Sequence, residues 1–146
     1  MSPAPGAERL KVVLDTNVYI SAFQYPKGRN VVLWDAAVVG QFRLLVSPAI
    51  IQEMAGVLRD DFKWSDDRVQ NAVRIVARVA GKGIVIPHTR VHLVTADPDD
   101  DRILECAVDG KADLIVSNDR HLLHLKAYAD IPIVAGVDFR RTLGLK

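Results

Sequence analysis

Four acidic residues from distant parts of the sequence have the chemistry to hold a divalent cation: Asp15, Glu53, Asp100 and Asp119. Carboxylate oxygens are hard ligands, and they select Mg²⁺ or Mn²⁺ over zinc. A cation held only by carboxylates keeps bound water, which is what the hydrolysis of a phosphodiester requires. The sequence therefore predicts metal-dependent hydrolysis, either with one metal and a carboxylate base or with a pair of metals.

Two of these acids follow predicted strands directly. Asp15 comes after an apolar run at residues 10–14, and Asp119 comes two residues after a second run at 114–117. Short unbroken Val, Leu and Ile runs are typical of strands buried on both faces. Because ligands in open α/β sheets bind beyond the carboxyl ends of the strands, we expect Asp15 and Asp119 to meet at that edge.

Glu53 and Asp100 lie near the start of two predicted helices whose N-termini point at the same edge. Ser47-Pro48 provides an N-cap hydroxyl followed by proline at the first helical position, which puts Glu53 in the second turn. Glu53 also borders the apolar stripe of that helix, where an unpaired carboxylate is costly to bury. A shared cation would satisfy all four charges together, and the helix N-termini favour them further.

The third acid could be Asp97, Asp100 or Asp101, because the three crowd one turn. Asp100 stands three residues before Ile103 and seven before Ala107, on the apolar face of the helix. We therefore choose Asp100 as the inner ligand. The same periodicity predicts that Asp101 turns toward solvent, and that Asp97 is a turn residue or a more distant support.

Predicted strands and helices alternate along the whole chain. The strands are expected at residues 10–14, 43–46, 84–86, 114–117 and 131–134. The helices are expected around residues 18–23, 31–39, 48–58, 65–80, 97–108, 122–127 and 137–143. This alternation predicts an α/β fold with a central parallel sheet covered on both faces. We expect a loose tail at residues 1–9 and a single domain over residues 10–146.

Composition sets further bounds. A chain of 146 residues that is 49% hydrophobic can bury one substantial core. Its net charge of +1 argues neither for nor against nucleic acid, and the single cysteine, Cys106, excludes an intrachain disulfide framework. No apolar run approaches the roughly 20 residues that span a bilayer. Residues 1–10 lack the apolar core of a secretory signal, so we expect a soluble, cytoplasmic protein.

Four segments, in this order and at this spacing, resemble the acidic motifs of PIN-domain nucleases. They read VVLDTNVYISA at 12–22, SPAIIQE at 47–53, DPDDDRIL at 97–104 and LIVSNDRHLL at 114–123. Each motif alone is a weak signal, whereas the four together are specific. The resemblance spans about residues 10–144, and it implies a three-layer α/β/α sandwich, a homodimer and a metal-dependent ribonuclease that uses Mg²⁺ or Mn²⁺.

The resemblance also implies roles for single residues. The implied metal ligands are Asp15, Glu53, Asp100 and Asp119. Asn17 and Ser21 would be polar supports near the metal or the phosphate, and Ser117 would support Asp119. From position alone, four basic residues that follow or flank the site loops are candidates for gripping the substrate. They are Lys27, Arg29, Arg102 and Arg120, and for each one a solvated surface charge is an equally good interpretation.

Compact members of this family are often the toxins of VapBC-type toxin–antitoxin pairs, so the implied partners are RNA and a small antitoxin. One alternative is an RNA-processing or DNA-acting nuclease of the same family without an antitoxin. Another is an aspartate-dependent phosphatase. Phosphatases of the haloacid-dehalogenase type need a second Asp two residues after the nucleophile, where this chain has Asn17. The phosphatase is therefore disfavoured.

Overall fold

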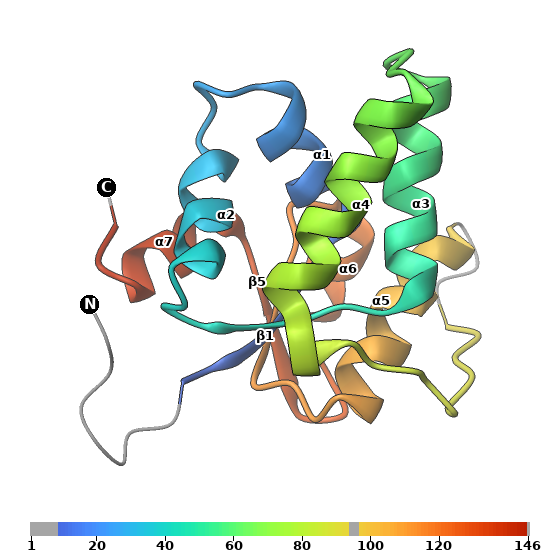
Figure 1. Ribbon diagram of the computed structural model, residues 1–146. Helices are drawn as coiled ribbons and strands as arrows, with labels where there is room; N and C mark the ends of the chain where they lie inside the picture. The colour runs from blue at the N-terminus through green and yellow to red at the C-terminus, as the bar shows by residue number, and fades with distance from the viewer. Residues whose placement is uncertain (1–8, 94–96, 146) are drawn as a thin grey trace.

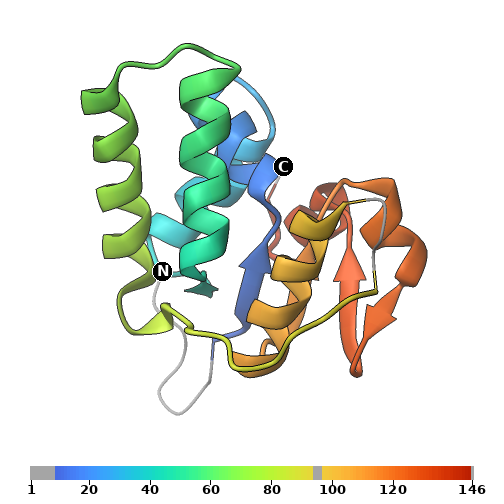
Figure 2. The same cartoon turned by 90° about the vertical axis from the view of Figure 1, so that its right-hand side faces the viewer.

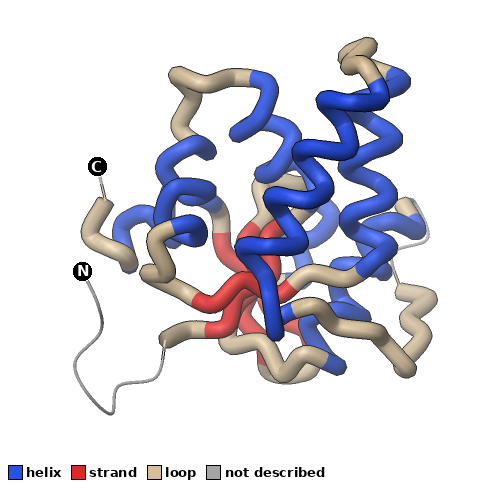
Figure 3. The backbone as a smooth tube through the Cα atoms, viewed as in Figure 1, coloured by secondary structure: helices blue, strands red, loops and turns tan. Residues whose placement is uncertain are grey.

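A five-stranded sheet with the strand order β2-β1-β3-β5-β4 forms the centre of the computed structural model (Figure 3). The strands are β1 (Lys11–Leu14), β2 (Arg43–Leu45), β3 (Leu114–Val116), β4 (Ala127–Tyr128) and β5 (Ile131–Val134). All pairings are parallel except that of β4 with β5. Val12, Val13 and Leu14 of the inner strand β1 are fully buried, as an apolar run between two layers of helices requires.

Helices flank both faces of the sheet (Figures 1 and 2), which confirms the predicted three-layer α/β/α class. They are α1 (Thr16–Gln24), α2 (Asn30–Val38), α3 (Pro48–Asp60), α4 (Asp66–Ala80), the 3₁₀ turn η1 (Gly81–Gly83), α5 (Pro98–Asp109), α6 (Arg120–Leu125) and α7 (Gly136–Thr142). The structure describes residues 9–93 and 97–145, so the tail expected at residues 1–9 lies almost wholly outside it. Within the described ranges, no helix has the length and apolar character needed to cross a membrane.

The strand expected at residues 84–86 is wrong. Only one parallel bridge forms there, between Val46 and Ile84, and the chain then leaves the sheet. The bridge is made by Val46, whose N–H donates to the carbonyl of Gly83 and whose carbonyl accepts from Val85. Beyond it Ile86 is 62% exposed, so this short apolar run has no buried face to hold it against β2.

The helix expected at residues 122–127 ends two residues early. Lys126 adopts a left-handed φ of 61°, which stops α6, and Ala127–Tyr128 then pairs with β5. The two strands are joined by Ala129 and Asp130, both with positive φ, as a tight two-residue hairpin turn requires. Glycine or asparagine would have marked this turn in the sequence, and neither is present.

The close approach of η1 to β2 generates a testable prediction. A Cβ atom at Gly83 would overlap the carbonyl oxygen of Leu44, whereas a Cβ at Gly56, inside α3, meets nothing within 4 Å. Gly83→Ala should therefore destabilise the fold by about 2 kcal/mol or more, since backbone must move to accommodate it. Gly56→Ala should stabilise it by about 0.5–1 kcal/mol, because a helix-interior glycine is costly.

Urea unfolding of the two variants beside the wild type measures both effects. If Gly83→Ala unfolds at the same urea concentration as the wild type, η1 does not approach β2 as described.

Candidate functional site

Asp15 and Asp119 stand at the carboxyl ends of the neighbouring strands β1 and β3, and Ser117 links them. The Ser117 hydroxyl donates to Asp15 Oδ2 at 2.7 Å and accepts from the Asp119 backbone N–H at 3.0 Å. Ser117 is fully buried and Asp15 is nearly so. One hydroxyl therefore fixes the position of one carboxylate and the backbone of the other.

Asp119 is also the N-cap of α6. Its Oδ1 accepts hydrogen bonds from the backbone N–H groups of His121, at 2.7 Å, and Leu122, at 3.3 Å. The cap explains why α6 begins at Arg120. It occupies one carboxylate oxygen and holds the half-buried side chain at the edge of the sheet.

Glu53 reaches the same edge from α3. That helix begins as predicted, with the Ser47 hydroxyl accepting from the N–H of Ile50 at 3.3 Å. The half-buried carboxylate of Glu53 accepts from the Thr16 hydroxyl at 3.0 Å. Sequence reasoning did not anticipate Thr16, and its only signal was its place directly after Asp15.

Asp100 lies in the first turn of α5 and is 4% exposed. Its Oδ2 atom is buried and has no hydrogen-bond partner among the described residues. Asp97 caps the same helix by accepting from the N–H of Asp99 at 3.0 Å, which agrees with its prediction as a turn residue. The buried side of this turn therefore presents an unsatisfied carboxyl group.

The pKa values show that these acids lie close enough to repel one another. Burial, followed by repulsion from Asp119, Asp97, Asp15 and Glu53, raises the pKa of Asp100 to about 8. Burial and the Asp99 charge raise the pKa of Glu53 to about 7, against the opposing hydrogen bond from Thr16. Burial also raises the pKa of Asp15, while the Ser117 hydrogen bond opposes the rise. The structure thus brings Asp15, Glu53, Asp100 and Asp119 into one electrostatic group.

The donor set suits a hard divalent cation. Among the described residues, no Lys or Arg forms an ion pair with any of the four acids, and no three His, Cys, Asp or Glu side chains lie so that they could hold a metal ion as they stand. The buried Oδ2 of Asp100 has no hydrogen-bond partner among the described residues, and an all-oxygen set matches Mg²⁺ or Mn²⁺. These residues therefore fit such an ion chemically, and its charge would offset their mutual repulsion.

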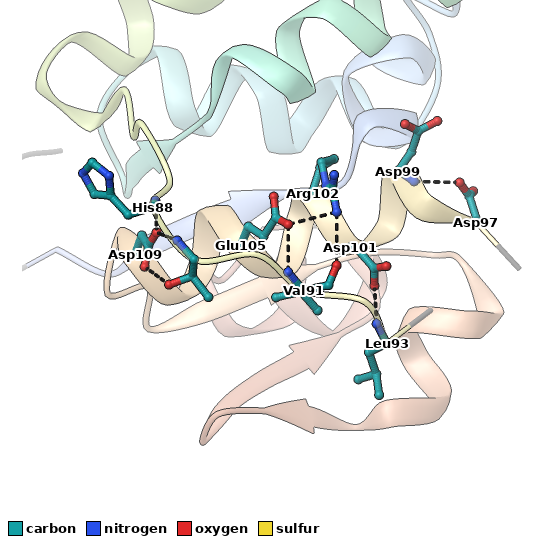
Figure 4. A network of polar contacts seen from close by, with 10 residues as sticks. His88, Val91, Leu93, Asp97, Asp99, Asp101, Arg102, Glu105 and Asp109 are labelled. Atoms are coloured by element: carbon teal, nitrogen blue, oxygen red, sulfur yellow. Dashed lines mark hydrogen bonds and ion pairs between the residues drawn. The ribbon is translucent and has the colours of Figure 1, made fainter. Parts of the chain in front are cut away.

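The solvent-facing orientation predicted for Asp101 is wrong. Asp101 is 4% exposed, and its Oδ1 accepts from the backbone N–H of Leu93 at 3.3 Å. Figure 4 shows the reason, since the irregular segment at residues 88–93 runs along that side of α5 and covers it. Asp100 and Asp101 therefore face different surroundings, which separates two candidates that the sequence had left crowded.

Two more acids of α5, at four-residue spacing from Asp101, hold the same segment (Figure 4). The almost fully buried Glu105 accepts from the Val91 N–H at 2.9 Å, and Asp109 accepts from the Thr89 N–H at 2.8 Å. Arg102 donates to the Val91 carbonyl at 3.1 Å and pairs with Glu105 at 2.9 Å. The guanidinium of Arg102 is thus committed to the segment.

The remaining predicted residues lie around the acidic edge. Asn17 is exposed on α1, and Ser21 is half-buried one turn further along the same helix. The other basic candidates, Lys27, Arg29 and Arg120, are at least partly exposed. Solvent access leaves all three able to meet a charged ligand.

Comparisons with known proteins fit this geometry. The family model described as PIN domain matches residues 11–121, a range that includes all four acids. An uncharacterized protein of Methanocaldococcus jannaschii, MJ1680, is 28% identical over 124 residues, which cover 81% of this chain and 76% of that protein.

A solved structure is similar in fold. It is the VapBC2 complex from Rickettsia felis, bound to a DNA fragment from the promoter of VapBC2. The TM-score is 0.53, and the match covers 86% of this chain and 98% of that chain. The two sequences are only 13% identical, so this likeness concerns the fold alone.

The crowded acids predict an unusual dependence of stability on pH when divalent cations are absent. Glu53 and Asp100 keep their protons in the folded state up to pKa values of about 7 and 8, against ordinary values of 4.5 and 3.8. Between these limits the folded state binds more protons than the unfolded chain, so the free energy of unfolding falls as the pH rises. This contribution of the two acids to the free energy of unfolding is present below about pH 4 and lost above about pH 8. Each unit of difference between the folded and unfolded pKa values is worth at most about 1.4 kcal/mol, and less where solvent screens the charge.

Urea unfolding in EDTA at several pH values measures this loss. The Asn side chain of Asp100→Asn cannot ionise, so this variant should keep only the smaller pH dependence due to Glu53, whereas Asp35→Asn, at an exposed position of α2, should leave the dependence unchanged. A wild-type stability that stays level or rises between about pH 5 and pH 8 would contradict the proposed crowding of charge.

Proposed function

The chain belongs to the PIN domain family, and from this premise we propose that it is a metal-dependent endoribonuclease, the toxin of a type II toxin–antitoxin pair. PIN domains are generally nucleases, which hydrolyse phosphodiester bonds, and they generally use divalent metal ions. The observation that carries the proposal is the buried Asp100 carboxyl group, which has an unpartnered oxygen and lies beside three further acids.

We assign the ligands of Mg²⁺ or Mn²⁺ to Asp15, Glu53, Asp100 and Asp119. When bound, the ion supplies a water of lowered pKa and offsets the charge that develops on the phosphate. Ser117 holds the Asp15 carboxylate, and Thr16 holds that of Glu53, by the hydrogen bonds described above. Glu53 is the more accessible of these two carboxylates, so we assign it to accept the proton of the attacking water.

Supporting roles follow from position. Asn17 and Ser21 lie four residues apart on α1, and therefore on one face of that helix, where both can meet the phosphate. Asp97 caps α5 and so keeps the first turn, with Asp100, in place. The solvent-accessible Lys27, Arg29 and Arg120 are assigned to the RNA backbone, whereas Arg102 is assigned to the segment that it anchors.

The toxin role is supported by the fold that this chain shares with VapBC2. We propose a cognate antitoxin as the protein partner, a homodimer as the working form and the cytoplasm as the location. Expression of the chain alone should arrest growth. A short upstream gene with a DNA-binding pattern should accompany its gene, and co-expression of that gene should relieve the arrest.

Asp100→Asn should remove RNA cleavage while leaving the fold intact. Loss of a residue that only orients a metal ligand costs about 10–100-fold in activity, so loss of an inner ligand should cost at least about 100-fold. Asp101→Asn is the matched control, since it changes the adjacent buried acid on the same helix and keeps an oxygen for Leu93. The wild type and both variants are compared by their rates of RNA cleavage with Mn²⁺, and far-ultraviolet circular dichroism checks that each is folded. A fully active Asp100→Asn variant would show that the assignment of Asp100 as a metal ligand is wrong.

Metal removal tests the class of enzyme. The purified protein is incubated with mixed single-stranded RNA, mixed DNA or a phosphomonoester, with Mn²⁺ and with EDTA. We expect RNA cleavage that is lost in EDTA and restored by Mn²⁺, because no Lys or Arg pairs with the acids in the described part of the chain. Cleavage of DNA alone would favour the DNA-acting alternative, and hydrolysis of the phosphomonoester alone would overturn the nuclease.

A further inference from the structure

A polar cavity of about 310 Å³ lies between α1, the start of α2, the residues after β3, and α7. It is lined by Ser21, Arg29, Asn30, Asn118, Val137 and Arg140. Two arginines, two asparagines and a serine are among the lining residues, and no acidic residue is. The composition is the reverse of that at the neighbouring acidic edge.

Two residues connect the cavity with the acidic edge. Asn118 lies between Ser117 and Asp119, the residues that position the acids after β3. Ser21 lies on α1, the helix that begins directly after Asp15. The cavity therefore adjoins two of the segments that carry the acids.

The amide of Asn118 is held in a defined orientation. Its Oδ1 accepts from the Gly136 backbone N–H at 3.0 Å, which leaves the NH₂ group as the free end. A Cβ at position 136 would lie 3.4 Å from that Nδ2 and 3.6 Å from the Oδ1 of Asn30. Glycine at this position thus leaves room beside both amides, and Asn118 presents donors.

The two arginines of the cavity have no ion-pair partner in the parts of the chain that the structure describes. The adjacent Arg141 differs, because it pairs with Asp138 at 3.4 Å and its side chain is 77% exposed. Guanidinium groups bind phosphate oxygens through paired N–H donors, and amide and hydroxyl donors complete such sites. Two arginines without an ion pair among the described residues, beside further donors, suit an anion, and phosphate matches these donors.

We propose that this cavity binds a backbone phosphate of the RNA strand next to the bond that is cut, with Arg29 and Arg140 as its main ligands. The inference rests on the proposed function, because it takes the polyanion to be the nuclease substrate. Ionised acids repel the phosphates of a nucleic acid, so the strand needs an attractive group beside them. A donor-lined cavity beside them supplies the attraction that holds the strand in register.

The test uses the full chain with a fluorescent single-stranded RNA of mixed sequence as the probe. Binding is measured by anisotropy in EDTA over a range of salt concentrations, and cleavage is measured separately with Mn²⁺. The test variant is Arg29→Gln/Arg140→Gln. Arg141→Gln is the matched control, since it removes a charge from the same helix outside the cavity.

The double variant should bind RNA about tenfold more weakly, and the slope of log affinity against log salt should fall by about 0.7, because one phosphate of the strand is no longer neutralised. Its KM should rise while kcat stays within about twofold, because the cavity holds the strand and not the reacting atoms. Arg141→Gln should change the affinity by less than about twofold.

A second pair of variants tests the cavity independently, in case the double variant does not fold. Val137 is 44% exposed at the cavity wall, so Val137→Glu adds a carboxylate there and Val137→Gln adds the same bulk without charge. Val137→Glu should weaken RNA binding more than Val137→Gln does.

Equal affinities and salt slopes for the double variant and Arg141→Gln would overturn the inference, as would a fall in kcat with unchanged KM. Retained RNA binding with loss of binding to an acidic peptide, such as oligoglutamate, would assign the cavity to a protein partner and also overturn it. A wild type that cleaves no RNA refutes the proposed function, whereas the binding measurements in EDTA still decide whether the cavity holds RNA.

Discussion

Asp15, Glu53 and Asp100 have raised pKa values because they are buried beside one another at the carboxyl edge of the sheet. Burying like charges costs free energy, so the rest of the structure must hold them there. Parallel strands enforce the crowding, since β1 and β3 deliver Asp15 and Asp119 to adjacent positions. The fully buried residues of β1 hold that geometry, because they pack between the two layers of helices.

Helix α5 carries two adjacent aspartates that have different functions. Successive residues on a helix are about 100° apart, so Asp100 and Asp101 point in different directions. Asp100 contributes to the crowded acids, whereas Asp101 and Glu105 accept backbone N–H groups of the segment at residues 88–93. These hydrogen bonds satisfy an irregular stretch that has no strand partner. They also fix the rotation of α5 and with it the direction of Asp100.

The positions of the acids could be predicted because each depends on a local signal. Asp15 and Asp119 follow apolar strands, and Glu53 follows the Ser47 cap, which the structure contains. The burial of Asp101 could not be predicted, because the covering segment at residues 88–93 has no periodicity of its own. The hydrogen bond from the Thr16 hydroxyl to Glu53 could not be predicted either, since it joins two side chains that are 37 positions apart in the sequence.

Errors in the predicted elements have related causes. Strand β4 depends on a turn whose residues, Ala129 and Asp130, carry none of the usual turn signals, although both adopt positive φ. The run at residues 84–86 is apolar enough for a strand, yet Ile86 finds no core to pack against. In both cases tertiary packing overrides local propensity, which is weakest in short edge elements. Neither error reaches the acidic edge, because that edge is set by the inner strands.

The two arginines of the cavity come from other parts of the chain than the acidic edge. All four acids lie within the PIN domain match at residues 11–121, whereas Val137 and Arg140 come from α7, beyond that match. Helix α7 packs on α2, which starts beside Arg29, so the two arginines of the cavity come from segments that do not position the acids. Changes in α7 can therefore alter how a strand is held while the carboxylates keep their geometry. In a nuclease built this way, the chemistry belongs to the sheet edge, and the grip on the substrate belongs to the helices around it.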